Sequence, residues 1–156
     1  MSTAQPRNDT IEHGDLSALI CSDEAETQTA VIEQLTQLGF GIHTALNPEE
    51  VTVKLKALLY DVVVISERFS GADAQTNCAL LEIARMPLVH RRESFVILVG
   101  PGMVSRSEMQ AFTHSVDLVV KDSDLADLKT VAGRGIVRQE EFYAAFNSVI
   151  KAIRAV

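Results

Sequence analysis

The residues able to do chemistry in this chain follow short apolar runs. Ser22 and Asp23 come after the first run, Ser66 closes the third, Gly100 closes the fourth, and Lys121 follows the fifth. A carboxylate and an ammonium group at one edge could bind a small anion or pair with each other, with a serine hydroxyl as a further polar contact. A single carboxylate is a poor site for Mg²⁺, which needs several oxygen ligands. No nucleophile and base stand in a pattern that indicates catalysis, so we expect no enzyme and no catalytic residue.

Five apolar runs are the elements that must position these side chains. A continuous rather than alternating run is typical of a parallel strand that is covered on both faces. Because helical patterns separate the runs, the sequence predicts an α/β, flavodoxin-like, three-layer sandwich. Its five-stranded parallel sheet has the order 2-1-3-4-5, with helices on both faces. Ligands of that fold sit at the carboxyl ends of the strands. The runs cover residues 17–21, 40–45, 62–65, 95–99 and 117–120.

Capping residues and helix breakers predict where the helices begin and end. Asn47 and Ser105 each stand three residues before a glutamate, as in a capping box. A third helix is expected over residues 72–85, and the Met-Pro pair that follows this segment ends it. Residues 124–135 are expected to form an extra short helix and a loop, because two glycines near the end of that segment break the helical pattern. A long last helix then starts near Gln139.

From residue 16 to residue 156 the chain resembles the bacterial response-regulator receiver family. A receiver has acidic residues after strand one, a phosphoacceptor aspartate ending strand three, a hydroxyl residue ending strand four and a lysine after strand five. Here Asp23 and Lys121 match, whereas Ser66 replaces the phosphoacceptor and Gly100 replaces the hydroxyl residue. Further departures are Ser22 at the first acidic position, Leu118 at the aromatic switch and Asp122 at the proline.

The resemblance implies a pseudo-receiver, whose pocket has lost its reaction. Aspartyl phosphate is formed by a carboxylate nucleophile and turns over, whereas a serine phosphate is an unactivated ester that persists. The matching residues leave three interpretations open. Asp23 and Lys121 could form a structural pair beside Ser66, the edge could bind an anion or metabolite, or Ser66 could be phosphorylated by a kinase.

Composition limits the classes of partner. The formal net charge of -7 argues against nucleic acid, and no apolar run is long enough to span a membrane. The two cysteines and four histidines show no metal-ligand spacing, so we expect no metal and no cofactor. Residues 1–15 are polar and are expected to form a flexible tail rather than a signal peptide. A cytoplasmic location follows as the expectation.

The leading hypothesis is a phosphorylation-independent protein-binding module in bacterial signalling, with a small-molecule or anion-binding module as the alternative. Receivers often dimerise or bind partners through the fourth helix, fifth strand and last helix. By resemblance, the candidate partner is another protein or a second copy of the chain. The apolar stripe of the last helix is expected to pack mostly on the sheet. The candidate partner face consists of Phe112, Leu118, Tyr143, Phe146 and Ile150.

Overall fold

A five-stranded parallel sheet forms the centre of the protein. The computed structural model describes residues 16–71, 73 and 75–155, so the predicted tail of residues 1–15 lies outside the described part. The strand order is β2-β1-β3-β4-β5, which confirms the predicted order. The apolar runs form the strands because both faces of each are covered. The strands are β1 (Ser17–Cys21), β2 (Gly41–Ala45), β3 (Val62–Ser66), β4 (Phe95–Gly100) and β5 (Leu118–Lys121).

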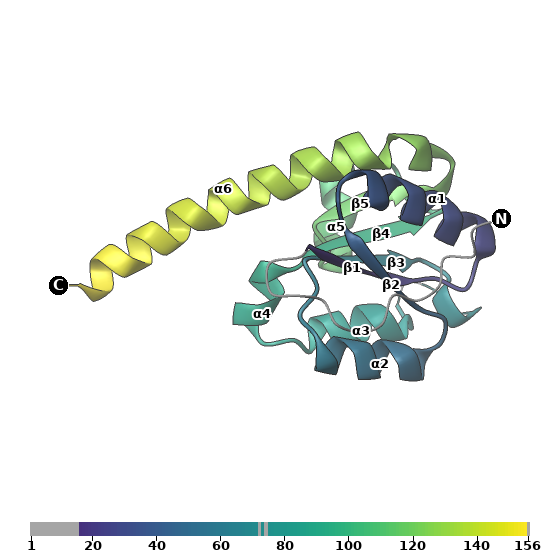
Figure 1. Ribbon diagram of the computed structural model, residues 1–156, viewed down its shortest axis with the longest axis horizontal. Coiled ribbons are helices and arrows are strands. Elements are labelled where there is room, and N and C mark those ends of the chain that lie inside the picture. The colour runs from purple at the N-terminus through teal and green to yellow at the C-terminus, as the bar shows by residue number, and fades with distance from the viewer. Residues whose placement is uncertain (1–15, 72, 74, 156) are drawn as a thin grey trace.

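Helices cover both faces of the sheet, as predicted (Figure 1). Val31 and Leu35 of α1 pack with Leu128 and Ala132 of α6 against one face. The other face carries α2, α3 and α5, whose buried residues join a second apolar cluster. The helices are α1 (Ala25–Gln37), α2 (Pro48–Ala57), α3 (Cys78–Ala84), α4 (Leu88–Glu93), α5 (Glu108–His114) and α6 (Leu128–Arg154).

Two predicted helix boundaries are corrected by the loops that precede them. The third helix starts at Cys78 rather than at residue 72, because buried Asn77 caps it. The fourth starts at Glu108 with Ser107 as its cap. Ser105 is not the cap, because Arg106 has a left-handed backbone with φ 65° and turns the chain between the two serines. The cap at Asn47 is confirmed, and its side chain accepts a 2.9 Å hydrogen bond from the Glu50 N–H.

One helix was not predicted. Pro87 ends the preceding segment and directly precedes α4, a short helix that buries none of its side chains. Because α4 has no apolar stripe, hydrophobic periodicity gives no signal for it. Its Arg91 contacts the residue directly before β5, donating to Asp117 at 3.0 Å.

The break predicted within residues 124–135 is wrong. A 3₁₀ turn over Asp122–Asp127 leads directly into α6, which runs without interruption through Gly133 and Gly135 to Arg154. Glycine lowers helix stability by only about 1 kcal/mol, which packing can offset. At Gly135 a Cβ atom would lie 2.6 Å from Cζ of Phe95. This glycine therefore allows α6 to approach β4 closely.

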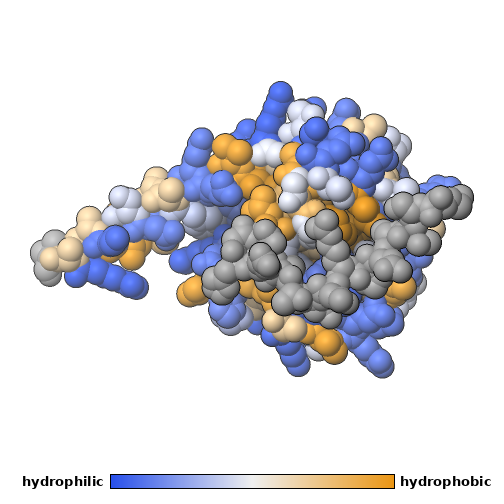
Figure 2. Space-filling view, viewed as in Figure 1, coloured by the Kyte–Doolittle hydropathy of each residue, from blue (hydrophilic) through white to orange (hydrophobic). Residues whose placement is uncertain are grey.

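The apolar stripe of the last helix does not pack on the sheet as predicted. The contacts with the sheet come from the first turns of α6, through Leu128 and Ala132. The later part of α6 extends away from the body of the protein (Figure 1). Apolar and charged surface lies along this projecting part (Figure 2). The exposed apolar residues on it are Phe142, Phe146, Val149 and Ile153.

Both cysteines are free thiols, one in a strand and one in a helix. Cys21 is fully buried in β1, and its burial raises the pKa of the thiol far above its ordinary value. Burial also raises the pKa of Cys78, which is partly exposed. Within the described part of the chain, no helix is long and apolar enough to cross a membrane.

Candidate functional site at the carboxyl edge of the sheet

The strand register brings the predicted site residues to one edge. Ser66 is paired with Val99, and Gly100 is paired with Lys121. Cys21, the last residue of β1, is paired with Ile65, so Ser22 and Asp23 leave the sheet beside the end of β3. The carboxyl ends of the strands therefore meet where the fold predicts a ligand site.

Ser66 is held in the backbone framework of this edge. The residue is buried, and its carbonyl oxygen accepts a 2.8 Å hydrogen bond from the amide of Asn77. The same amide donates to the carbonyl of Glu67 at 3.2 Å. The oxygen of Asn77 accepts from the N–H groups of Ala79 and Leu80 at the start of α3. One buried side chain thus joins the end of β3 to the next helix.

Asp23 is engaged by the loop that follows β3. Its Oδ2 atom accepts a 3.2 Å hydrogen bond from the N–H of Ser70, a residue with a left-handed backbone at φ 58°. Ser22 is buried, and its hydroxyl accepts from the Glu24 N–H at 3.2 Å. The two residues after β1 therefore hold the local backbone.

Glu67 fills the space beside the end of β4. Its Oε2 atom accepts a 3.0 Å hydrogen bond from the N–H of Gly102. A Cβ atom added to Gly100 would overlap both the Cβ and the carboxylate of Glu67. A hydroxyl residue at position 100 and this placement of Glu67 are therefore mutually exclusive. The replacement of the expected hydroxyl residue by glycine has a steric reason.

Lys121 lies at the exposed end of β5, and its backbone is fixed by Ser105. The Lys121 N–H donates to the Ser105 hydroxyl at 2.9 Å, and that hydroxyl donates to Asp124 at 2.6 Å. In the described part of the chain Asp23 and Lys121 do not form an ion pair, which was one of the three interpretations left open by the sequence. In the described residues the ion pairs are Arg85–Glu82 and Arg91–Asp117.

The chemistry available at this edge is limited. Across the described residues, no three His, Cys, Asp or Glu side chains come together in a way that could hold a metal ion. The two carboxylates nearest the end of β3, those of Asp23 and Glu67, each accept a backbone hydrogen bond from a loop. These two carboxylates therefore hold loops at this edge.

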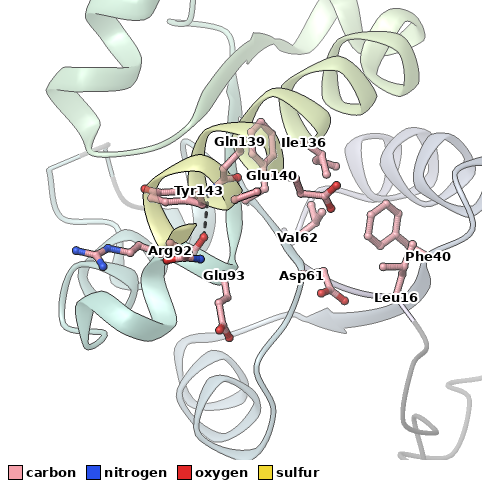
Figure 3. A pocket seen from close by; sticks show the side chains of 13 residues that line it. Leu16, Phe40, Asp61, Val62, Arg92, Glu93, Ile136, Gln139, Glu140 and Tyr143 are labelled. Carbon is pink, nitrogen blue, oxygen red and sulfur yellow. Dashed lines mark hydrogen bonds between the residues drawn. The ribbon is translucent and has the colours of Figure 1, made fainter. Parts of the chain in front are cut away.

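A hollow of about 490 Å³ lies at the opposite edge of the sheet (Figure 3). Leu16, Phe40 and Asp61 come from the sheet side, and Gln139 and Tyr143 come from α6 (Figure 3). Asp61 is already engaged, because it accepts from the N–H of Ser17 at 2.8 Å. Asp61 therefore serves the fold by holding the start of β1.

The predicted partner face divides into two surfaces. Phe112, Leu118 and Tyr143 line a groove of about 620 Å³ between α5, β5 and α6. Phe112 is 83% exposed, whereas Leu118 is buried and forms the floor. Phe146 and Ile150 lie further along α6, outside this groove. The face consists of a groove with an exposed aromatic rim and of a helical stretch that continues from this groove along α6.

The sequence did not predict the roles of two residues at this edge. Glu67 directly follows the third strand, but sequence does not tell which way its side chain points. Asn77 lies within a segment that was expected to be helical. Its position before an apolar Ala-Leu-Leu run was the available signal, because asparagine is a preferred N-cap.

Comparison with known proteins shows the receiver fold. NtrX from Brucella abortus superposes with TM-score 0.64 and 15% identity, over 85% of this chain and 29% of that chain. A putative response regulator from Chloroflexus aurantiacus gives TM-score 0.64 and 13% identity, over 79% of this chain and 98% of that chain. A two-component response regulator from Clostridium difficile gives TM-score 0.61 and 17% identity, over 80% of this chain and 97% of that chain.

The likeness is one of architecture. The chain spans less than a third of the length of NtrX, 29%, and nearly the whole of the other two domains. No protein-family model and no curated protein matches the sequence. At identities this low the similarity defines the class of fold, and function has to be argued from the site.

Proposed function

We propose that this protein is a phosphorylation-independent pseudo-receiver that acts in the bacterial cytoplasm as a protein-binding module. The observation that carries the proposal is the placement of Glu67 across Gly100 and Gly102. Together with buried Ser66 at the end of β3, it leaves the edge with neither a phosphoacceptor carboxylate nor an open hydroxyl position. The receiver-like architecture then serves as a scaffold, and the function resides on its surface.

If the protein is independent of phosphorylation, a small-molecule phosphate donor should not modify it. Incubation with acetyl phosphate and Mg²⁺ should leave the intact mass of the protein unchanged, because a serine hydroxyl does not form an acyl phosphate. A conventional receiver domain in the same tube, phosphorylated on its aspartate, controls for the reagent. A stoichiometric, acid-labile phosphoryl adduct on this chain would refute the proposal.

The groove between α5, β5 and α6 has features of a binding surface. Phe112 stands exposed at its rim, and buried Leu118 and Val119 form part of its floor. Large exposed aromatic side chains are frequent anchors of protein interfaces. Three exposed arginines line the same groove, against two acidic residues, Glu108 and Asp117, of which Asp117 is already paired with Arg91. We therefore propose a partner segment that combines apolar and acidic residues; the arginines are Arg106, Arg134 and Arg138.

Replacing Phe112 by glutamate should weaken partner binding by about tenfold or more, because it removes the aromatic anchor and places a charge in the groove. The measurement is quantitative capture of cross-linked partners from the native host. The matched control is Val53→Glu, which introduces the same residue at an exposed position of α2. Equal capture by wild type and both variants would exclude this groove as the binding face.

A further inference from the structure

One heptad-spaced stripe runs along α6, apolar except at Gln139, and the protein covers only its first half. Leu128 and Ala132 begin the stripe and are fully buried against the sheet. Gly135 continues it at the close contact with Phe95. Seven residues after Gly135 the stripe resumes in the part of α6 that projects from the body (Figure 1). We call residues 140–154 the arm.

The apolar residues of the arm are exposed. The exposed fractions are 64% for Phe142, 37% for Phe146, 58% for Val149 and 64% for Ile153. Phe146 is the most covered, because the guanidinium of Arg92 lies 5.0 Å from its ring centroid. Three large side chains more than half exposed on one helix face form an apolar patch that a monomer rarely leaves uncovered.

The spacing of the stripe is that of a coiled coil. Its members are separated by four, three and four residues, which is the alternation of heptad positions a and d. A period of 3.5 residues keeps the stripe facing a partner helix over several turns. The flanking heptad positions carry no charge that would oppose helix pairing; they are Tyr143, Ala145, Ile150 and Ala152.

The charges of the arm select its partner. Glu140 and Glu141 stand at the start of the arm, and Lys151 and Arg154 stand near its end, all exposed. A second copy placed antiparallel brings the acidic end of each arm beside the basic end of the other. A parallel copy would instead place like charges together. These residues occupy heptad positions b, c and f, outside the helix contact, so they favour the antiparallel orientation through the net attraction of opposite ends and not through interhelical ion pairs.

The side-chain sizes fit the same orientation. In an antiparallel pair, position a of one helix meets position d of the other, so Phe142 faces Ile153 and Phe146 faces Val149 of the second copy. Each layer then combines one large aromatic and one smaller branched side chain, which favours even packing. A parallel pair would place Phe146 against Phe146. In the antiparallel pair the last residues of each arm lie beside the first residues of the other arm, where that arm leaves the body of its own copy.

We infer that two copies of this protein associate through their α6 arms as a short antiparallel coiled coil. The inference deepens the proposed function, because it names a second copy as one occupant of the interaction surfaces. Phe142 and Tyr143 at the start of the arm also line the groove around Phe112. The arm is therefore tested at Val149 and Ile153, which lie outside that groove. Failure of the arm to self-associate and failure of the groove variant are separate results, measured on different residues.

Sedimentation equilibrium over a micromolar concentration range tests the association. Wild type should show reversible dimerisation, and Val149→Glu/Ile153→Glu should raise the dissociation constant by at least about 100-fold, because it buries unpaired charges. Ser148→Glu, next to Val149 but outside the stripe, is the control and should dimerise like wild type. A monomeric wild type at every concentration overturns the inference, and so does a dimer that both variants retain.

Cysteine cross-linking tests the orientation, in a Cys78→Ser background that leaves only buried Cys21. A mixture of Phe142→Cys and Ile153→Cys proteins should form a mixed disulfide, because these positions face each other in the antiparallel pair. Ile153→Cys alone should not, because the two cysteines would lie about 16 Å apart along the helix axis. Efficient cross-linking of Ile153→Cys alone would overturn the antiparallel arrangement.

Discussion

Gly100→Ser, which restores the hydroxyl that receivers carry at this position, is expected to lower the free energy of unfolding by about 1–3 kcal/mol. The usual effect of replacing a strand glycine is the opposite, because glycine loses more backbone entropy on folding than other residues. Here the added Cβ overlaps the Cβ of Glu67 as well as its carboxylate. Rotating the carboxylate away relieves only part of the overlap, since the Glu67 Cβ is fixed by the backbone.

A double-mutant cycle identifies the cause. In a Glu67→Gly background both the Cβ and the carboxylate are gone, so Gly100→Ser should cost markedly less than it does in wild type. Urea unfolding of the four proteins measures the coupling free energy. Gly41→Ser is the control, because a Cβ there meets only the Leu16 carbonyl oxygen, at 3.6 Å. The steric account fails if Gly100→Ser is as costly without Glu67 as with it.

The same pair explains why the loss of the receiver pocket involves several positions at once. Glu67 accepts the Gly102 N–H and covers Gly100, so the side chain after β3 and the glycines after β4 depend on one another. Restoring an aspartate at position 66 alone would leave Glu67 in place beside it. We therefore expect that reactivity would require changes on both strands.

The sheet could be predicted from sequence because its signals are local and strong. Runs such as 62–65 and 95–99 are continuous and apolar, and right-handed parallel crossovers leave few strand orders. The edge residues Ser66, Gly100 and Lys121 follow from where those runs end. Their convergence in the structure is a direct consequence of the strand register.

The remaining features could not be predicted, because they depend on contacts between distant segments. By helix propensity Gly135 favours a break. In the structure the helix continues, because the absence of a side chain at Gly135 leaves room for the ring of Phe95. The stripe of α6 keeps one period and is interrupted only by Gln139, so periodicity alone does not show that the covered part ends before Phe142. The position of Glu67 likewise depends on glycines more than thirty residues away in the chain.

Asn77→Ala is expected to lower the free energy of unfolding by about 2–4 kcal/mol. Loss of the helix cap accounts for about 1 kcal/mol. Removal of the amide that serves the Ser66 and Glu67 carbonyls adds about 1–3 kcal/mol, because these acceptors lie in a buried or partly buried setting. The effect should exceed that of most single substitutions, since one fully buried side chain makes four hydrogen bonds.

Asn47→Ala is the matched control, because Asn47 is also an asparagine cap but is exposed and accepts from the Glu50 N–H. It should cost only about 1 kcal/mol, so the difference between the two variants measures what the buried donor contributes. Hydrogen exchange adds a local readout. If Asn77 positions Glu67, the Gly102 amide that donates to Glu67 should exchange faster in Asn77→Ala than in a variant of equal global stability. Equal losses for the two asparagines, or an unchanged Gly102 amide, would mean that the end of β3 is held by the sheet alone.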